Sequence, residues 1–267
     1  MQFSAVFYLT LVFFGTNDML KRERQAFILH QVNLHNKVLS SGLSQEIKVS
    51  EDTIRRDLQE LADDGKLIKV HGGALSPSFD QLNYPSTKIY SHTQKNAIAQ
   101  KAVSLIEDGM FILSGGGTTI IEMARNLPLS LKATFISGSI PAIVEYMHHP
   151  NCDVIVIGDK LSKNSKITVG AEAIKQINQI KADICFLGIN AIDIRYGITD
   201  NDWEVVQLKK AMIESAQRVV CMTIAEKINT VQPIQIGLLQ SIDVLITELP
   251  PDSPELKPYI DAGIHVM

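Results

Sequence analysis

The chain has 267 residues, of which 45% are hydrophobic and 20% are charged, and its formal net charge is −4. This length accommodates one large domain, or a small domain followed by a medium one, and the composition is that of a globular protein. The negative charge excludes a protein that coats nucleic acid along its whole length, although a small nucleic-acid-binding module on an acidic body is compatible with it.

Residues 3–15, FSAVFYLTLVFFG, form a short apolar run. The run is shorter than the roughly 20 residues of a membrane span. It also lacks the basic start and the small-residue cleavage site of a secretory signal. We therefore interpret residues 1–18 as an extension ahead of the authentic start at Met19, with no membrane association; an interfacial anchor is the alternative.

Residues 19–74 contain nine Lys or Arg and eight Asp or Glu, whereas the rest of the chain contains sixteen and twenty-one. The sign of this asymmetry fits a nucleic-acid-binding head on an acidic body. The three cysteines, Cys152, Cys185 and Cys221, form no CxxC motif. We therefore expect reduced thiols in the cytoplasm, with no disulfide framework and no metal site.

Three helices are predicted in the first segment. Apolar residues at helical spacing indicate helices over 20–32 and 38–47, and residues 48–49 indicate a turn. Ser50 is a natural N-cap for a third helix that ends near Gly65, and acidic residues at 51–52 suit the positive end of its dipole. The buried face of this helix is predicted to comprise Ile54, Leu58 and Leu61.

Two helices joined by a tight turn are typical of a helix-turn-helix, whose second helix presents its first residues to the major groove. With the apolar residues facing inward, Thr53, Arg56 and, on the flank, Arg55 are free to face DNA. An arginine can pair with both acceptors of guanine, or it can clamp phosphate without reading sequence. The alternative is a solvated helix face.

Residues 65–74, GKLIKVHGGA, predict a strand, a turn and a returning strand. In such a wing, Lys66, Lys69 and His71 could reach the DNA backbone or the minor groove. Basic residues on a short hairpin are more often plain surface, so the prediction depends on the order of three helices followed by a wing.

These segments resemble the amino-terminal domain of DeoR-type bacterial transcription regulators. The resemblance rests on an ERxxxIL opening at 23–29, an S-x-x-TIRRDL helix at 50–58 and a G-x-L-x-x-x-HGGA wing at 65–74. It implies a winged helix-turn-helix domain over 19–74 that binds double-stranded operator DNA. The implied DNA-binding residues are Ser50, Thr53, Arg55, Arg56, Lys66, Lys69 and His71.

After a linker at 75–89, marked by proline and serine, the chain alternates helical patterns with apolar runs. The helical patterns cover 95–107, 118–126, 141–147, 171–179, 203–216 and 254–262, and the runs are MFILS, ATFIS, CDVIVIG, ADICFLG, RVVCMT, IDVLITE and IHVM. This alternation predicts an α/β domain over 90–267 with a mostly parallel, Rossmann-like sheet covered on both faces. Ligands of such domains bind beyond the carboxyl ends of the strands.

The loop 114–119, SGGGTT, follows one of these strands and opens a helix. Glycine N–H groups, a helix dipole and threonine hydroxyls favour an anion there. No Gly-Lys-Ser/Thr follows, and Ile120 occupies the third glycine position of a dinucleotide fingerprint, so a phosphate monoester or sugar phosphate fits better. A tight turn that needs glycine is the alternative. Lysines at 160, 163 and 166 supply further positive charge, unless they are simply solvated.

This second segment resembles the DeoR family's sensor domain, which is related in fold to ribose-phosphate isomerases and binds a phosphorylated sugar or similar metabolite. Its D-x-G-T-T, T-N-S, T-V-G and D-x-S-K elements correspond to 115–119, 137–139, 168–170 and 224–227. The resemblance implies an effector site without a cofactor or metal. The implied residues are Gly115, Gly116, Gly117, Thr118, Thr119, Ser137, Gly138, Ser139, Lys166, Gly170 and Lys227.

Four positions depart from the family pattern. Gly115 replaces the acidic residue of the first loop, and Gly138 replaces the asparagine of the second. Asp159 stands in place of a glycine in the third loop, and Ile224 in place of the aspartate three residues before Lys227. These departures imply that the groups that would hold sugar hydroxyls are partly absent.

Our leading hypothesis is a DNA-binding regulator of carbohydrate metabolism genes, most simply a repressor, controlled by a phosphorylated sugar and acting as a homodimer or homotetramer. A phosphosugar isomerase with a fused DNA-binding head is the enzymatic alternative. It needs a general base, for which Asp200, Asp202 and Glu204 are candidates, although acids at a helix start are more simply dipole partners. A regulator that has lost its ligand is the third hypothesis.

Overall fold

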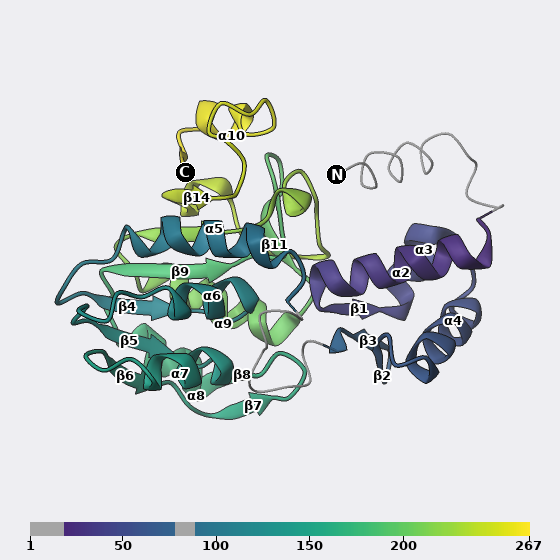
Figure 1. Ribbon diagram of the computed structural model, residues 1–267, viewed down its shortest axis with the longest axis horizontal. Helices are drawn as coiled ribbons and strands as arrows, with labels where there is room; N and C mark the ends of the chain where they lie inside the picture. Colours follow the sequence, from purple (N-terminus) through teal and green to yellow (C-terminus); the bar gives the residue numbers. More distant parts are fainter. Residues whose placement is uncertain (1–18, 78–88) are drawn as a thin grey trace. The chain divides into compact units, whose positions relative to one another are not determined.

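The computed structural model describes residues 19–77 and 89–267 (Figure 1). The chain divides into two compact units, residues 1–81 and 82–267, which are described separately below. The predictions for residues 1–18 and for most of the linker lie outside the described residues. No helix in the described ranges is long and apolar enough to cross a membrane.

Over residues 19–77, the first unit contains three helices and a small antiparallel sheet. In chain order its elements are α2 (Lys21–His35), β1 (Lys37–Leu39), α3 (Ser40–Ile47), α4 (Glu51–Asp63), β2 (Ile68–Val70) and β3 (Gly73–Leu75). The strands lie in the order β1-β3-β2. The three predicted helices and the wing hairpin are all present, and their apolar faces form one core around Ile28, Ile54 and Leu58.

The second helix is shorter than predicted. Val38 and Leu39 belong to β1, which pairs with β3, and α3 begins only at Ser40. The pairing is close: a Cβ built on Gly73 would lie 1.9 Å from the carbonyl oxygen of Val38. Only glycine therefore fits at this position, and strand pairing between distant residues overrides the local helical pattern of 38–39.

The second unit is built on a seven-stranded parallel sheet with the order β15-β14-β12-β9-β4-β5-β6. Its strands are β4 (Phe111–Ser114), β5 (Thr134–Ser137), β6 (Asp153–Val156), β9 (Ile184–Gly188), β12 (Val219–Met222), β14 (Val244–Ile246) and β15 (His265–Val266). Each of the seven predicted apolar runs contains one of them. Ile184, Cys185, Phe186 and Leu187 of the central β9 are all at most 1% exposed, so both faces of the sheet are covered.

The helices of this unit follow the predicted order with shifted ends. They are α5 (His92–Val103), α6 (Thr118–Arg125), α7 (Ile140–Met147), α8 (Ala171–Asn178), α9 (Trp203–Glu214) and α10 (Lys257–Asp261). Helices α5, α6 and α7 pack in series, and α8 packs on α9 (Figure 1). Buried residues of α8 and α9 join alternate residues of the strands in one core cluster.

Short antiparallel strands that the sequence patterns did not predict interrupt this regular alternation. The lysine-rich segment expected to be a loop forms the hairpin β7 (Lys160–Ser162) and β8 (Ile167–Val169). A separate sheet contains β10 (Ala191–Asp193), β11 (Gly197–Asp200) and β13 (Ile234–Gly237). These strands are three or four residues long, which is too short for an alternation of polar and apolar residues to identify them.

Candidate functional site

Helix α4 begins at the predicted N-cap. The Ser50 hydroxyl accepts a hydrogen bond from the backbone N–H of Thr53 at 3.2 Å and lies 2.9 Å from the Thr53 hydroxyl. The cap satisfies one of the free N–H groups of the first turn, and Glu51 and Asp52 lie at the positive end of the helix dipole. The start of the helix, from which DNA would be contacted, is therefore well defined.

The buried face of α4 contains an ion pair that the sequence did not reveal. Ile54, Leu58 and Leu61 are buried as predicted, and Asp57 is buried beside them. Asp57 accepts two hydrogen bonds from Arg24 of α2, one of them 3.2 Å long between Nη2 and Oδ1. Because a fork-shaped guanidinium meets both carboxylate oxygens, this pair fixes the orientation of α4 against α2.

Arg55 and Arg56 both project away from the core of the head, as predicted. The Arg55 side chain is 60% exposed and pairs with Glu51 at 3.2 Å and Asp52 at 3.0 Å. The Arg56 side chain is exposed, and it makes no ion pair among residues 19–77 and 89–267. The two arginines therefore differ, because the acids of the first turn partly neutralise Arg55.

The wing lies beside the exposed face of α4. Lys69 of β2 donates a hydrogen bond from Nζ to Oε1 of Gln59 at 2.8 Å, and Gln59 lies one turn after Arg56. Lys66 instead pairs with Asp64 at 2.9 Å, and His71 is exposed at the turn of the hairpin. The geometry thus makes Arg56, Gln59 and Lys69 one continuous polar surface, to which sequence reasoning had not assigned Gln59.

In the second unit, the glycine loop and the second predicted loop are joined by hydrogen bonds at the carboxyl ends of β4 and β5. The Ser137 hydroxyl donates to the Ser114 carbonyl at 2.8 Å, and the Ser139 N–H donates to the Ser137 hydroxyl at 3.2 Å. Gly117 has a φ of 108°, a backbone conformation that favours glycine. For this residue, the alternative explanation that the tight turn itself needs a glycine therefore holds. Thr118 and Thr119 open α6 and are largely buried.

Packing explains the glycine that replaces the family's asparagine in the second loop. A Cβ built on Gly138 would lie 2.1 Å from the Thr168 hydroxyl, which itself donates to the Ile157 carbonyl at 2.8 Å. The backbone N–H of Thr168 also donates to the Gly138 carbonyl at 2.9 Å. An asparagine at 138 therefore requires Thr168 to move.

Asp159, which departs from the family pattern, connects the third loop to the start of α8. Its carboxylate accepts a hydrogen bond from the backbone N–H of Glu172 at 3.3 Å, in the first turn of α8. A Cβ on Gly170 would lie 2.7 Å from this carboxylate, and the φ of Gly170 is 110°. The carboxylate thus stands where the helix dipole would otherwise favour a bound anion.

Lys166 joins the third loop to the second, because its carbonyl accepts a hydrogen bond from the Ile140 N–H at 2.9 Å. Lys163 is exposed, and Lys160 pairs with Glu204 at 2.9 Å while remaining 67% exposed. These two lysines fit the alternative of solvated surface. The structure therefore gathers loops 114–119 and 137–139 and the segment 166–170, which contains β8, at one edge of the sheet.

Lys227 follows β12 at this same edge and is almost completely buried. Its ammonium lies 3.4 Å from Oδ1 of Asn190 and 3.5 Å from the Ile189 carbonyl, both long for hydrogen bonds. Burial, together with the positive charges of Lys95 and Lys209, lowers the pKa of Lys227 to about 7. The residue is thus a buried cation that the protein itself compensates poorly.

A second buried lysine adjoins Lys227. Lys209 of α9 pairs with Asp200 at 2.7 Å and donates to the Gly188 carbonyl at 2.9 Å, and Asn190 donates to Asp200 at 2.8 Å. Burial alone would raise the pKa of Asp200, but the charge and hydrogen bonds of Lys209 and the Asn190 hydrogen bond lower it overall. A Cβ on Gly188 would lie 2.9 Å from the Gly116 carbonyl, so this network adjoins the glycine loop.

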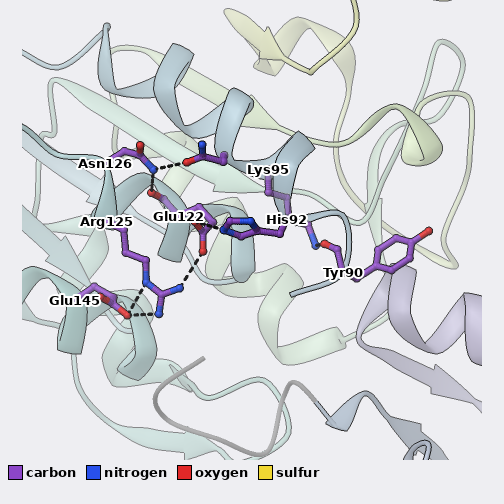
Figure 2. Close-up of polar contacts among 8 residues, drawn as sticks. Tyr90, His92, Lys95, Glu122, Arg125, Asn126 and Glu145 are labelled. Carbon is purple, nitrogen blue, oxygen red and sulfur yellow. Dashed lines mark hydrogen bonds and ion pairs between the residues drawn. The ribbon is translucent and has the colours of Figure 1, made fainter. Parts of the chain in front are cut away.

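A third buried lysine, Lys95 of α5, was not recognised from the sequence. Its ammonium donates to the Tyr90 carbonyl at 2.7 Å, as Figure 2 shows, and burial lowers its pKa to about 8. The signal that could have identified it is its spacing from Ile98 and Ala99, which are fully buried on the same helix face. The carboxylate of Glu226 accepts from the Tyr90 hydroxyl at 2.8 Å and offsets part of the local positive charge.

Helices α5, α6 and α7 are connected by a chain of polar side chains (Figure 2). His92 lies 3.2 Å from the buried carboxylate of Glu122, which also accepts from Arg125 at 2.9 Å. Arg125 in turn donates to Glu145 at 2.6 Å. These polar contacts hold α6, whose first turn carries the glycine loop, between its two neighbours.

The acids proposed as a general base for an enzyme all have structural partners. Asp200 is held in the ion pair with Lys209, and Asp202 caps α9 by accepting from the Val205 N–H at 3.4 Å. Glu204 pairs with Lys160. The simpler explanation, acids that stabilise a helix start, therefore accounts for Asp202.

A winged helix-turn-helix head on a parallel α/β domain with glycine loops at the strand ends defines a ligand-sensing transcription regulator. Residues 24–79 match the DeoR-like helix-turn-helix domain and residues 90–249 match the DeoR C-terminal sensor domain. The chain belongs to the DeoR family of transcription regulators.

Several relatives align with nearly the whole chain. The HTH-type transcriptional regulator YulB of Bacillus subtilis is 32% identical over 93% of this chain and 96% of its own length. The regulator GolR of Listeria innocua is 29% identical over 93% of this chain and 98% of its own length. The glycerol-3-phosphate regulon repressor of Escherichia coli is 27% identical over 93% of this chain and 99% of its own length. A solved ribose 5-phosphate isomerase A from Methanocaldococcus jannaschii aligns with 52% of this chain and 55% of its own, at 19% identity and a TM-score of 0.39.

Proposed function

We propose that this regulator binds a DNA operator through α4 and the wing, and that it represses genes of carbohydrate metabolism in the cytoplasm until a phosphorylated metabolite is bound. The observation that carries the DNA-binding half is the exposed surface of Arg56, Gln59 and Lys69, which joins the wing to the helix that the Arg24–Asp57 pair orients. Because one head contacts only one half-site, we propose that the protein acts as a homodimer or homotetramer.

Within this surface we assign different roles to the two arginines. Arg56 has no competing carboxylate within the described residues, so its guanidinium can pair with both major-groove acceptors of a guanine. Arg55 would have to exchange Glu51 and Asp52 for DNA, which suits a phosphate contact that positions the helix without reading sequence. Lys66, Lys69 and His71 of the wing then add contacts to the backbone.

A binding assay separates these roles. The operator would be obtained by selection from random duplexes, and binding by Arg55→Ala and Arg56→Ala would be measured on the operator and on scrambled DNA. We expect Arg56→Ala to lose about 1–3 kcal/mol of discrimination between the two duplexes. We expect Arg55→Ala to weaken binding to both. Arg195→Ala, an exposed arginine of the sensor unit, is the matched control. Unchanged operator affinity in both head variants would defeat the proposal.

The proposed effector site lies at the carboxyl ends of β4, β5, β9 and β12. Its anion-binding groups are the backbone N–H groups of the glycine loop, the start of α6 and the poorly compensated ammonium of Lys227. A bound phosphate monoester would provide the negative charge that Lys227 otherwise lacks. The naming of the Escherichia coli relative as a glycerol-3-phosphate regulon repressor supports a phosphorylated effector.

A ligand screen tests this half independently of DNA. Thermal unfolding would be followed with inorganic phosphate, and with sugar phosphates and glycerol 3-phosphate alongside their unphosphorylated parents. We expect stabilisation only by phosphorylated compounds, and its loss in Lys227→Met but not in Lys175→Met, an exposed lysine of α8. A shift that persists in Lys227→Met would show that the anion binds elsewhere.

The regulator without a ligand remains the second candidate, because two observations favour it. The Asp159 carboxylate stands at the start of α8, and Thr168 fills the space beside Gly138. Both remove contacts that a sugar phosphate could use. The same thermal-unfolding screen distinguishes the two candidates. If no compound shifts the melting temperature while the protein still binds its operator, the regulator acts constitutively.

A further inference from the structure

Strand β6 forms one edge of the parallel sheet, and no other described strand pairs with its outer side. Its residues Val154, Ile155 and Val156 carry no charge and no proline, and the register with β5 is regular along the whole strand. Ile155 is 47% exposed and Val156 is 54% exposed. Natural proteins usually protect such an edge with charges, prolines or bulges. The only charge on β6 is that of Asp153 at its start, so the apolar edge over residues 154–156 indicates a partner strand.

The backbone of β6 offers a defined set of unpaired groups. The N–H of Asp153 donates to the Ala133 carbonyl at 3.0 Å, and the N–H of Ile157 donates to the Ser137 carbonyl at 2.9 Å. Because backbone groups alternate in direction along a strand, the N–H and C=O of Val154 and Val156 point out of the sheet. Two donors and two acceptors are therefore available at this edge.

We propose that β6 pairs with β6 of a second copy of this chain, about a two-fold axis that passes through Ile155. A two-fold axis makes the two edge strands antiparallel. In this register Val154 lies opposite Val156 of the partner copy and Ile155 lies opposite its own counterpart. The four outward groups of each strand then find partners in four hydrogen bonds, and two seven-stranded sheets become one continuous sheet.

The side chains favour a second copy of this chain over an unrelated strand. The segment Val154-Ile155-Val156 is the same in both directions, so the two-fold axis places valine against valine on one face and isoleucine against isoleucine on the other. Such β-branched cross-strand pairs stabilise a sheet. The Asp153 carboxylates are four residues apart along the ladder, about 14 Å at roughly 3.4 Å per residue, so they do not oppose each other.

Flanking apolar residues enlarge the contact beyond the strand. Met147, the last residue of α7, and Leu129 are both 71% exposed. Leu129 is held near the start of β6, because its carbonyl accepts from the Asn151 side chain at 2.6 Å. Antiparallel pairing brings the start of one β6 to the end of the other, where Val156 is exposed. Stable dimers bury about 1,200–2,000 Å², which requires such flanking contacts in addition to the strand.

Cysteine cross-linking of the full-length chain tests the register. In an antiparallel sheet, directly opposed residues that share no hydrogen bonds have Cα atoms about 4.5 Å apart, which a disulfide can span. In a Cys152→Ala background, we expect Ile155→Cys to form a covalent dimer under mild oxidation. Phe111→Cys, at a position that is also 47% exposed but on an interior strand, should not. Cross-linking of Ile155→Cys no greater than that of Phe111→Cys would overturn the proposal.

Sedimentation equilibrium provides a second test that does not depend on a disulfide. Ile155→Asp sets two carboxylates against each other on the axis, so we expect the dimer dissociation constant to rise by at least about tenfold. Ile194→Asp, at another exposed isoleucine, is the control, and circular dichroism shows whether each variant is folded. A folded Ile155→Asp protein with an unchanged dissociation constant, or a wild-type protein that is monomeric throughout, refutes the β6 dimer without affecting the DNA and effector proposals.

Discussion

Replacing Lys227 by methionine should make the ligand-free protein more stable at neutral pH. The pKa of Lys227 falls from 10.5 to about 7 because the ammonium is buried beside other lysines. The unfolded chain therefore binds this proton more tightly than the folded chain does. At 1.36 kcal/mol per pKa unit, a difference of about 3.5 units corresponds to a cost of about 5 kcal/mol for folding.

Methionine removes this cost but leaves a carbonyl and an amide oxygen without their long contacts to the ammonium. An unpaired buried acceptor costs about 1–3 kcal/mol. Because both contacts are already long, we take their joint loss as equivalent to one such acceptor and expect a net gain of about 2–4 kcal/mol in the free energy of unfolding at pH 7.

The pH dependence gives the decisive comparison. The cost of the lysine is fully present below pH 7, where the folded protein must protonate a buried amine, and it disappears as the pH rises to about 10.5. The advantage of Lys227→Met should therefore shrink with rising pH, and it should reverse between about pH 8 and pH 10, where the remaining cost of the lysine falls below the cost of the unpaired acceptors. Urea unfolding at a series of pH values measures it, with Lys175→Met as the exposed control. A variant that is less stable than the wild type at pH 7 would refute the reasoning.

Three further predictions concern packing. Asp57→Ala removes one partner of a buried ion pair, so it should destabilise the head by about 3–5 kcal/mol, measured by hydrogen exchange of the head amides in the full-length protein. Gly73→Ala should disrupt the pairing of β1 with β3 and abolish operator binding in gel shifts, whereas Gly42→Ala, with open space around its Cβ, should bind normally. Gly138→Asn should lower the melting temperature, and adding Thr168→Ala should recover part of the loss; additive effects of the two changes would contradict the contact between them.

Features that depend on neighbouring residues were predicted well from the sequence. The N-cap at Ser50, the buried stripe of α4 and the wing turn follow from spacing and residue type over a few positions. The seven strands of the parallel sheet were predicted because a strand covered on both faces needs a continuous apolar run. The exposed arginines followed from the same periodicity, since a helix with one buried stripe must direct its other side chains outward.

Part of the candidate site was predicted in the same way. The site was expected beyond the carboxyl ends of the parallel strands, and hydrogen bonds join the segments 114–119, 137–139 and 166–170 there. The hairpin of β7 and β8 within the lysine-rich segment was missed. Its strands are held by pairing with each other, and three residues contain too little pattern to reveal this.

By itself the sequence determined the order of the helices and of the seven parallel strands, the family, and the outward direction of Arg55 and Arg56, because each depends on local spacing. Only the tertiary structure decided which distant groups meet: Arg24 with Asp57, Lys209 with Asp200, and Thr168 with Gly138. It also decided that Lys95 and Lys227 are buried close enough to lower the pKa of Lys227. The physical reason is that burial and electrostatic coupling depend on distances across the folded chain, which the spacing of residues along it does not specify.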